Sequence, residues 1–99
     1  MIAEEHKELI IKTLASIDPR SIGVFGSYAR NEETTKSDLD ILIDPGRNLG
    51  MLELVRLENE LSQKLGIKVD LVTKRSLKNK KLRELINQDL RLITSDQGR

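Results

Sequence analysis

Two aspartates, Asp38 and Asp40, lie one residue apart in the otherwise apolar segment DLDILID at positions 38–44. Residues i and i+2 of a β-strand point to the same face of the sheet, so we expect the two carboxylates to project together. Neighbouring carboxylates repel each other, and this raises the free energy of ionising both. A hard cation such as Mg²⁺ relieves the repulsion and also binds substrate phosphates. The pair therefore predicts a magnesium site.

A third carboxylate, Asp70, interrupts the apolar segment IKVDLVT at positions 67–73. If this segment forms the strand next to 38–44, Asp70 can face the first two aspartates. Three carboxylates can hold two metal ions about 3.5–4 Å apart, an arrangement used for in-line displacement at phosphorus. The alternative is that Asp70 is a solvated strand residue outside the site.

A glycine–serine pair, Gly26 and Ser27, directly follows the apolar segment SIGVF at positions 21–25. Glycine lets the backbone come close to a ligand, and the N–H groups of a following helix attract an anion. Ser27 adds a hydroxyl donor, and Arg30 adds a charged one unless it is an ordinary surface arginine. Together these residues predict a triphosphate site opposite the metal site. Neither the P-loop nor the dinucleotide-binding motif fits, since no lysine follows Gly26 and position 29 is alanine.

Periodicity predicts the elements that position these residues. We expect helices over 3–17, 49–65 and 78–89, strands over 21–25, 38–44 and 67–73, and a short helix through Asn31 that Ser27 caps. In the last long helix, Leu82, Leu85 and Ile86 are expected to face inward. Segment 90–94 fits either a final strand or a frayed end, and the tail at 95–99 is expected to be disordered. The order α-β-α-β-α-β-α predicts an α/β domain with helices packed on a small sheet.

Composition narrows the function classes. The 99 residues fit one domain, and the absence of cysteine excludes disulfides and thiolate metal sites. Phe25 and Tyr28 are the only aromatic residues, which argues against direct binding of single-stranded nucleic acid by base stacking. No apolar run is long enough to span a membrane, and the acidic start does not resemble a secretory signal. We therefore expect a soluble cytoplasmic protein.

Charge is distributed unevenly along the chain. The net charge is +1, but residues 1–73 carry −4 and residues 74–99 carry +5. The basic C-terminal quarter is either a solvated helix face or a docking surface for an acidic partner protein, RNA or a triphosphate.

The segment GSYARNEETTKSDLDILID resembles the signature of the DNA polymerase β-like nucleotidyltransferase superfamily, and in particular its minimal nucleotidyltransferase (MNT) group. The resemblance covers residues 3–90 and implies one minimal nucleotidyltransferase domain over 1–99, with a small mixed palm sheet. It implies that Gly26, Ser27 and Arg30 bind the nucleotide and that Asp38, Asp40 and Asp70 are catalytic and hold Mg²⁺, with two ions. The glycine common after the arginine is replaced here by Asn31, which tolerates left-handed backbone geometry.

Members of this group are found beside HEPN-domain RNase toxins. The resemblance therefore implies an antitoxin that transfers AMP from ATP to a tyrosine of a HEPN partner. One alternative is a nucleotide-binding antitoxin with weak catalysis that neutralises its partner by docking. A further alternative is a nucleotidyltransferase that acts on RNA or a small molecule.

Overall fold

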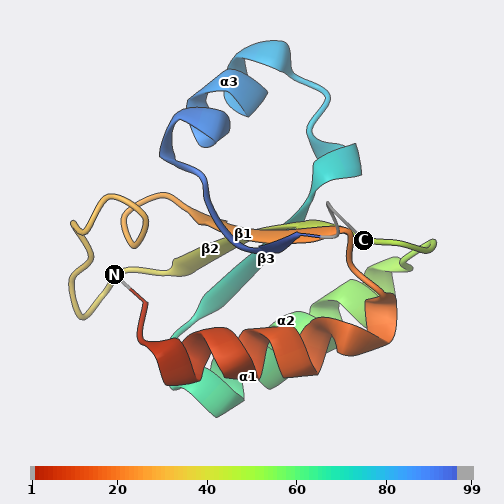
Figure 1. Cartoon of the computed structure of the whole chain (residues 1–99), viewed down its shortest axis with the longest axis horizontal. Helices are drawn as coiled ribbons and strands as arrows, with labels where there is room; N and C mark the ends of the chain where they lie inside the picture. The colour runs from red at the N-terminus through yellow and green to blue at the C-terminus, as the bar shows by residue number, and fades with distance from the viewer. Residues whose placement is uncertain (1, 96–99) are drawn as a thin grey trace.

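The structure is a computed structural model that describes residues 2–95. Its helices and strands follow the chain in the order α1 (Glu4–Leu14), β1 (Ser21–Phe25), β2 (Leu39–Asp44), α2 (Met51–Leu65), β3 (Val69–Thr73), α3 (Lys80–Asp89) and β4 (Arg91–Ser95) (Figure 1). Short 3-10 turns, Ala15–Ile17 and Lys74–Ser76, follow α1 and β3. The predicted long helices and the three predicted strands are all present, with bounds shifted by up to three residues.

The strands form one mixed sheet in the order β3-β2-β1-β4. β1 pairs antiparallel with β2 and with β4, whereas β2 and β3 run parallel. Parallel neighbours need a crossover connection, and α2 provides it. The predicted fold class, an α/β domain with a small mixed sheet, is confirmed, and of the segment 90–94, which fitted either a strand or a frayed end, residues 91–94 belong to β4.

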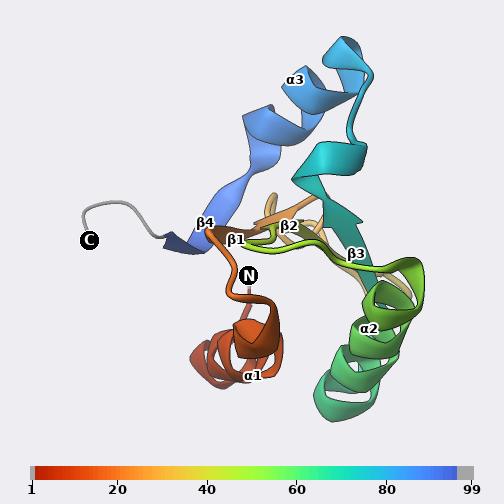
Figure 2. The ribbon, with the colours of Figure 1, turned by 90° about the vertical axis from the view of Figure 1, so that its right-hand side faces the viewer.

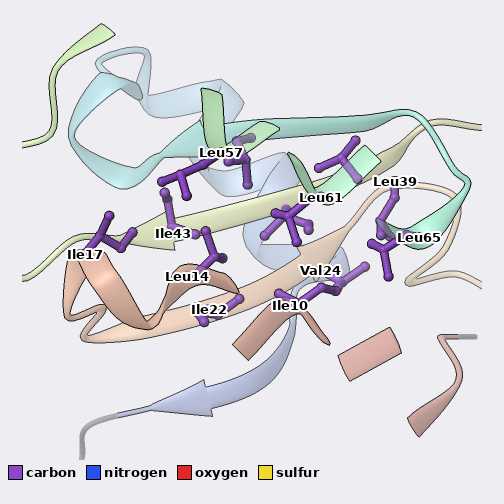
Figure 3. Close-up of a cluster of buried hydrophobic side chains, with 13 residues drawn as sticks. Ile10, Leu14, Ile17, Ile22, Val24, Leu39, Ile43, Leu57, Leu61 and Leu65 are labelled. Carbon is purple, nitrogen blue, oxygen red and sulfur yellow. The ribbon is translucent and has the colours of Figure 1, made fainter. Parts of the chain in front are cut away.

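The main core lies between the sheet and the pair α1 and α2, which lie side by side on one face of the sheet (Figure 2). Alternate residues of the strands point into this core, as period-2 patterning requires. Aliphatic side chains from both helices meet them there (Figure 3). The residues of this core are Ile10, Leu14, Ile17, Ile22, Val24, Leu39, Ile41, Ile43, Leu57, Leu61, Leu65, Val69 and Leu71.

Helix α2 also closes one edge of the sheet. β3 is an edge strand, and the Glu58 carboxylate accepts a hydrogen bond from the Leu71 N–H at 2.8 Å. The Ser62 hydroxyl accepts one from the Val69 N–H at 2.9 Å. Side chains of α2 thus satisfy edge donors that would otherwise be open to another strand. They also fix the backbone on both sides of Asp70.

The opposite face of the sheet carries only a small second cluster of Leu42, Leu77 and Ile86. α3 stands over this face, as both views show (Figures 1 and 2). The prediction for α3 was partly wrong: Ile86 is buried, but Leu82 and Leu85 are exposed. The helix contacts the sheet along a narrow line, because Ile86 is its buried residue.

The short helix predicted after the first strand does not form. Residues 26–31 make a series of turns, with one helical bond from the Arg30 N–H to the Gly26 carbonyl at 3.1 Å. Asn31 then adopts a left-handed φ of 59°, which stops further helical turns. A single turn is too short to repay the entropic cost of helix nucleation. The element order therefore differs from the predicted one here and in the final strand.

The predicted disordered tail lies almost entirely outside the described residues, since the structure describes the chain only to Ser95. Within residues 2–95, no helix combines the length and the hydrophobicity needed to cross a lipid bilayer.

Candidate active site

Strand register brings two of the predicted carboxylates together. β2 and β3 are parallel neighbours, and Asp40 is the direct partner of Asp70 across them. Paired residues of adjacent strands point to the same face of a sheet. This is the face opposite the main core, since the flanking residues Leu39, Ile41, Val69 and Leu71 all belong to that core. The expectation that Asp70 can face Asp40 is met.

The Asp40 carboxyl group is electrostatically disfavoured as an anion. Partial burial is the largest cause that raises its pKa, and the negative charges of Asp70 and then Asp38 raise it further. The positive charge of Arg30 lowers the pKa in part. Carboxylates held together without a full set of counter-charges are a suitable environment for a divalent cation.

Asp38 lies just before β2, where its carboxylate is 3.9 Å from the Lys68 ammonium group. Among residues 2–95, no three acidic or histidine side chains are gathered closely enough to form a ready-made metal site. The donor set nevertheless fits Mg²⁺, because all three candidates carry the oxygen ligands that this ion prefers. Asp38 has an exposed and salt-bridged side chain, so a bound ion has only a weak contact to displace.

Gly26 directly adjoins Asp40. Its φ is +76°, and a Cβ atom placed on it would lie 2.3 Å from Oδ2 of Asp40. Any larger residue would push the carboxylate out of place, besides straining the backbone. The sequence suggested that Gly26 allows close approach of a ligand. The structure adds that it allows close approach of the Asp40 carboxylate.

The turn after Gly26 leaves backbone donors open. The N–H groups of Ser27, Tyr28 and Ala29 donate to no acceptor within residues 2–95. The turn closes on itself through the Glu32 N–H, which donates to the Ser27 carbonyl at 2.9 Å. Although no helix follows, consecutive free N–H groups in a turn still form a concave anion-binding arrangement.

Arg30 forms two ion pairs. Nη1 donates to Asp89 at the end of α3 at 2.6 Å, and Nε donates to Glu32 at 2.8 Å. Both hydrogen bonds raise the pKa of the guanidinium, the bond to Glu32 most strongly. Sequence reasoning missed Asp89, Glu32 and Lys68 as neighbours of the site. Arg30 and Asp89 are 59 residues apart in the sequence, and the path of α3 brings them into contact. Local sequence patterns therefore could not reveal this pair.

The family model described as "Polymerase beta, Nucleotidyltransferase" matches residues 8–98 of the chain. Among curated proteins, "Putative protein adenylyltransferase MJ1217" of Methanocaldococcus jannaschii is 47% identical over 89 residues, covering 90% of this chain and 88% of that protein. "Protein adenylyltransferase MntA" of Thermococcus cleftensis is 50% identical over 60 residues, covering 61% of each chain.

Solved structures show the same fold. One, described as "Crystal structure of the toxin-antitoxin with AMP-PNP", matches with a TM-score of 0.82 and 27% identity over 92% of this chain and 74% of that one. Another holds a tri-AMPylated Shewanella oneidensis HEPN toxin in complex with MNT antitoxin. It matches with a TM-score of 0.76 and 25% identity over 95% of this chain and 73% of that one.

Proposed function

The chain belongs to the polymerase β nucleotidyltransferase family, and we propose that it is an antitoxin that transfers AMP from ATP to a tyrosine hydroxyl of a HEPN-type toxin. The observation that carries the proposal is the register pair of Asp40 and Asp70, which lies beside the left-handed Gly26. The relatives named as adenylyltransferases and the AMPylated toxin in a neighbouring structure support AMP as the transferred group.

Asp38, Asp40 and Asp70 would hold Mg²⁺, with two ions. Such ions would supply charge neutralisation on the phosphates and would favour ionisation of the attacking hydroxyl. The chain's own groups orient the nucleotide: the open N–H groups of residues 27–29 and the Ser27 hydroxyl donate to the phosphate oxygens. Arg30 adds a positive charge on the same side, once it exchanges a carboxylate partner for a phosphate.

The reaction forms one bond and breaks one. The acceptor oxygen bonds to the α-phosphorus of ATP, and the bond from that phosphorus to the bridging oxygen breaks, so pyrophosphate leaves. The acceptor's proton is lost toward the carboxylate of Asp70. Asp70 is exposed, so an incoming protein side chain can reach it.

A second candidate function is neutralisation by docking alone, with weak catalysis. The exposed leucines of α3 favour a protein contact, and the acidic residues are not preassembled for metal binding. Partial burial and the neighbouring carboxylates raise the pKa of Asp40. A carboxyl group in this unfavourable environment has no use in a pure docking protein, and this favours catalysis. No specific feature of residues 2–95 favours RNA or a small molecule as acceptor.

The reaction is tested with ATP labelled at either the α- or the γ-phosphate, incubated with Mg²⁺, this protein and a HEPN-domain toxin from the same organism. Adenylyl transfer places the α-label on the HEPN protein and releases the γ-label as pyrophosphate. Label from the γ-phosphate on the partner would instead mean phosphoryl transfer. Absence of label from both, with a complex formed, would favour docking alone. Mass spectrometry of the labelled peptide identifies the acceptor residue.

A further inference from the structure

Helix α3 exposes apolar side chains that the rest of the described structure does not cover. Leu82 is 46% exposed and Leu85 is 57% exposed, whereas Ile86, one turn after Leu82 on the same side of the helix, is buried. Lys81 is also exposed and lies one turn before Leu85 on the same helix face. We call Lys81, Leu82 and Leu85 the α3 surface.

This helix depends on very few contacts for its position. Its inner face reaches the sheet mainly through Ile86, which packs with Leu42 and Leu77. A helix of 10 residues is only marginally stable without tertiary packing. In Figure 2, α3 stands away from the sheet on the face opposite α1 and α2. A partner that covers Leu82 and Leu85 would therefore add packing that the helix lacks.

The α3 surface is on the same side of the sheet as the candidate active site. Leu42, which contacts Ile86, points to the same face as Asp40 two residues earlier on β2. The last residue of α3, Asp89, is joined to Arg30 of the nucleotide-binding turn at 2.6 Å. A protein that sits on α3 is thus close to the carboxylates, where an acceptor hydroxyl has to arrive.

Charge indicates what kind of partner fits. Residues 74–91 contain seven lysines or arginines and two acidic residues, and Lys78, Lys80, Lys81 and Arg83 are all exposed. Two exposed leucines surrounded by basic side chains are complementary to a partner surface with an apolar patch and a rim of acidic side chains. A nucleic acid would satisfy the lysines but would leave the leucines without an apolar contact.

We propose that the α3 surface is the docking site for the HEPN-type toxin, which binds through an apolar patch with an acidic rim, and that docking there delivers the acceptor hydroxyl to the carboxylates. This inference rests on the proposed function for the identity of the partner. It adds the surface that recognises the partner.

The test uses Leu82→Glu, Leu85→Glu and, as control, Met51→Glu, Leu52→Glu. The control residues are 74% and 79% exposed at the start of α2, so each double variant replaces two exposed apolar residues and adds two negative charges. Circular dichroism verifies that both variants fold. Calorimetry measures the Kd for a HEPN-domain toxin from the same organism, and the α-label assay measures transfer.

We expect the α3 variant to raise the Kd by about 30-fold or more, the effect of losing hot-spot side chains, and the control to leave it within about threefold. Transfer by the α3 variant should fall at low partner concentration and recover at saturating partner. Unchanged affinity, or equal losses in both variants, would overturn the docking site even if transfer occurs. A selective affinity loss without transfer by the unmodified protein would support the docking site and reject the proposed reaction. Binding of a single-stranded oligoribonucleotide that the glutamates weaken, with affinity for the partner unchanged, would overturn the docking site.

Discussion

At the scale of single residues, Asp40 acts against the stability of the metal-free protein. Partial burial, Asp70 and Asp38 raise its folded-state pKa above the unfolded value. A carboxyl group with a raised folded-state pKa stabilises the fold most at low pH, and this contribution is lost as the pH rises through the folded-state pKa. At neutral pH the carboxylate is therefore a destabilising group in the metal-free protein.

Asp40→Asn should therefore raise the melting temperature of the metal-free protein by a few degrees at pH 7, while abolishing transfer. The amide removes the repulsion with Asp70 and Asp38. The gain should shrink at acidic pH, where the wild-type carboxyl is protonated as well. Thermal unfolding at both pH values measures this. A variant that melts below the wild type at pH 7 would contradict the electrostatic account.

Gly26 is the other residue whose type is fixed by the site. Gly26→Ala should destabilise the protein by about 1–2 kcal/mol, because alanine resists the left-handed backbone. Transfer should fall by more than stability accounts for, since the added methyl displaces the Asp40 carboxylate. Gly50→Ala is the control, because a Cβ at Gly50 meets no atom within 4 Å. Chemical denaturation measures the loss of stability in both variants, and the label assay measures the loss of transfer. Equal losses in Gly26→Ala and Gly50→Ala would disprove the role of Gly26.

At the scale of elements, the sequence predicted part of the arrangement of the candidate site. The third aspartate was expected to face the D-x-D pair, and parallel pairing of β2 and β3 places Asp70 opposite Asp40. Asp38 lies just before β2, and within residues 2–95 the three carboxylates do not gather into one group. The turn at 26–31 was predicted as a helix because capping signals are read locally, whereas the left-handed Asn31 ends the turn. The exposure of Leu82 and Leu85 was missed because helical periodicity shows an apolar face but not whether anything covers it.

The ion pair between α3 and the turn at 26–31 leads to a prediction at this scale. Asp89 occupies the guanidinium of Arg30 that would bind phosphate. Asp89→Asn should therefore lower the KM for ATP by up to about fivefold, the usual size of an exposed ion pair. The effect should vanish in an Arg30→Ala background, which a double-mutant cycle measures. A higher KM in Asp89→Asn would mean that Asp89 positions Arg30 and does not compete for it.

At the scale of the whole molecule, the two faces of the sheet differ: one holds the main core and the other carries the candidate site. The face toward α1 and α2 holds the main aliphatic core, which keeps the strands in register. The opposite face is only lightly covered, and it carries the carboxylates and the basic helix α3. The basic segment 74–91, with seven lysines or arginines and two acidic residues, includes α3 on this face. Composition alone could not show it, because which face of the sheet each segment covers depends on the connections between strands.

The central claim is that the carboxylates of the β2–β3 register transfer AMP to a HEPN-type partner. The most direct measurement is the fraction of partner that carries AMP after incubation with Mg²⁺ and ATP, at equal concentrations of complex, for the wild type and Asp38→Asn, Asp40→Asn. We predict a modified partner with the wild type, none with the double variant, and a complex formed by both. An unmodified partner with both proteins, still neutralised to the same extent, would contradict the claim.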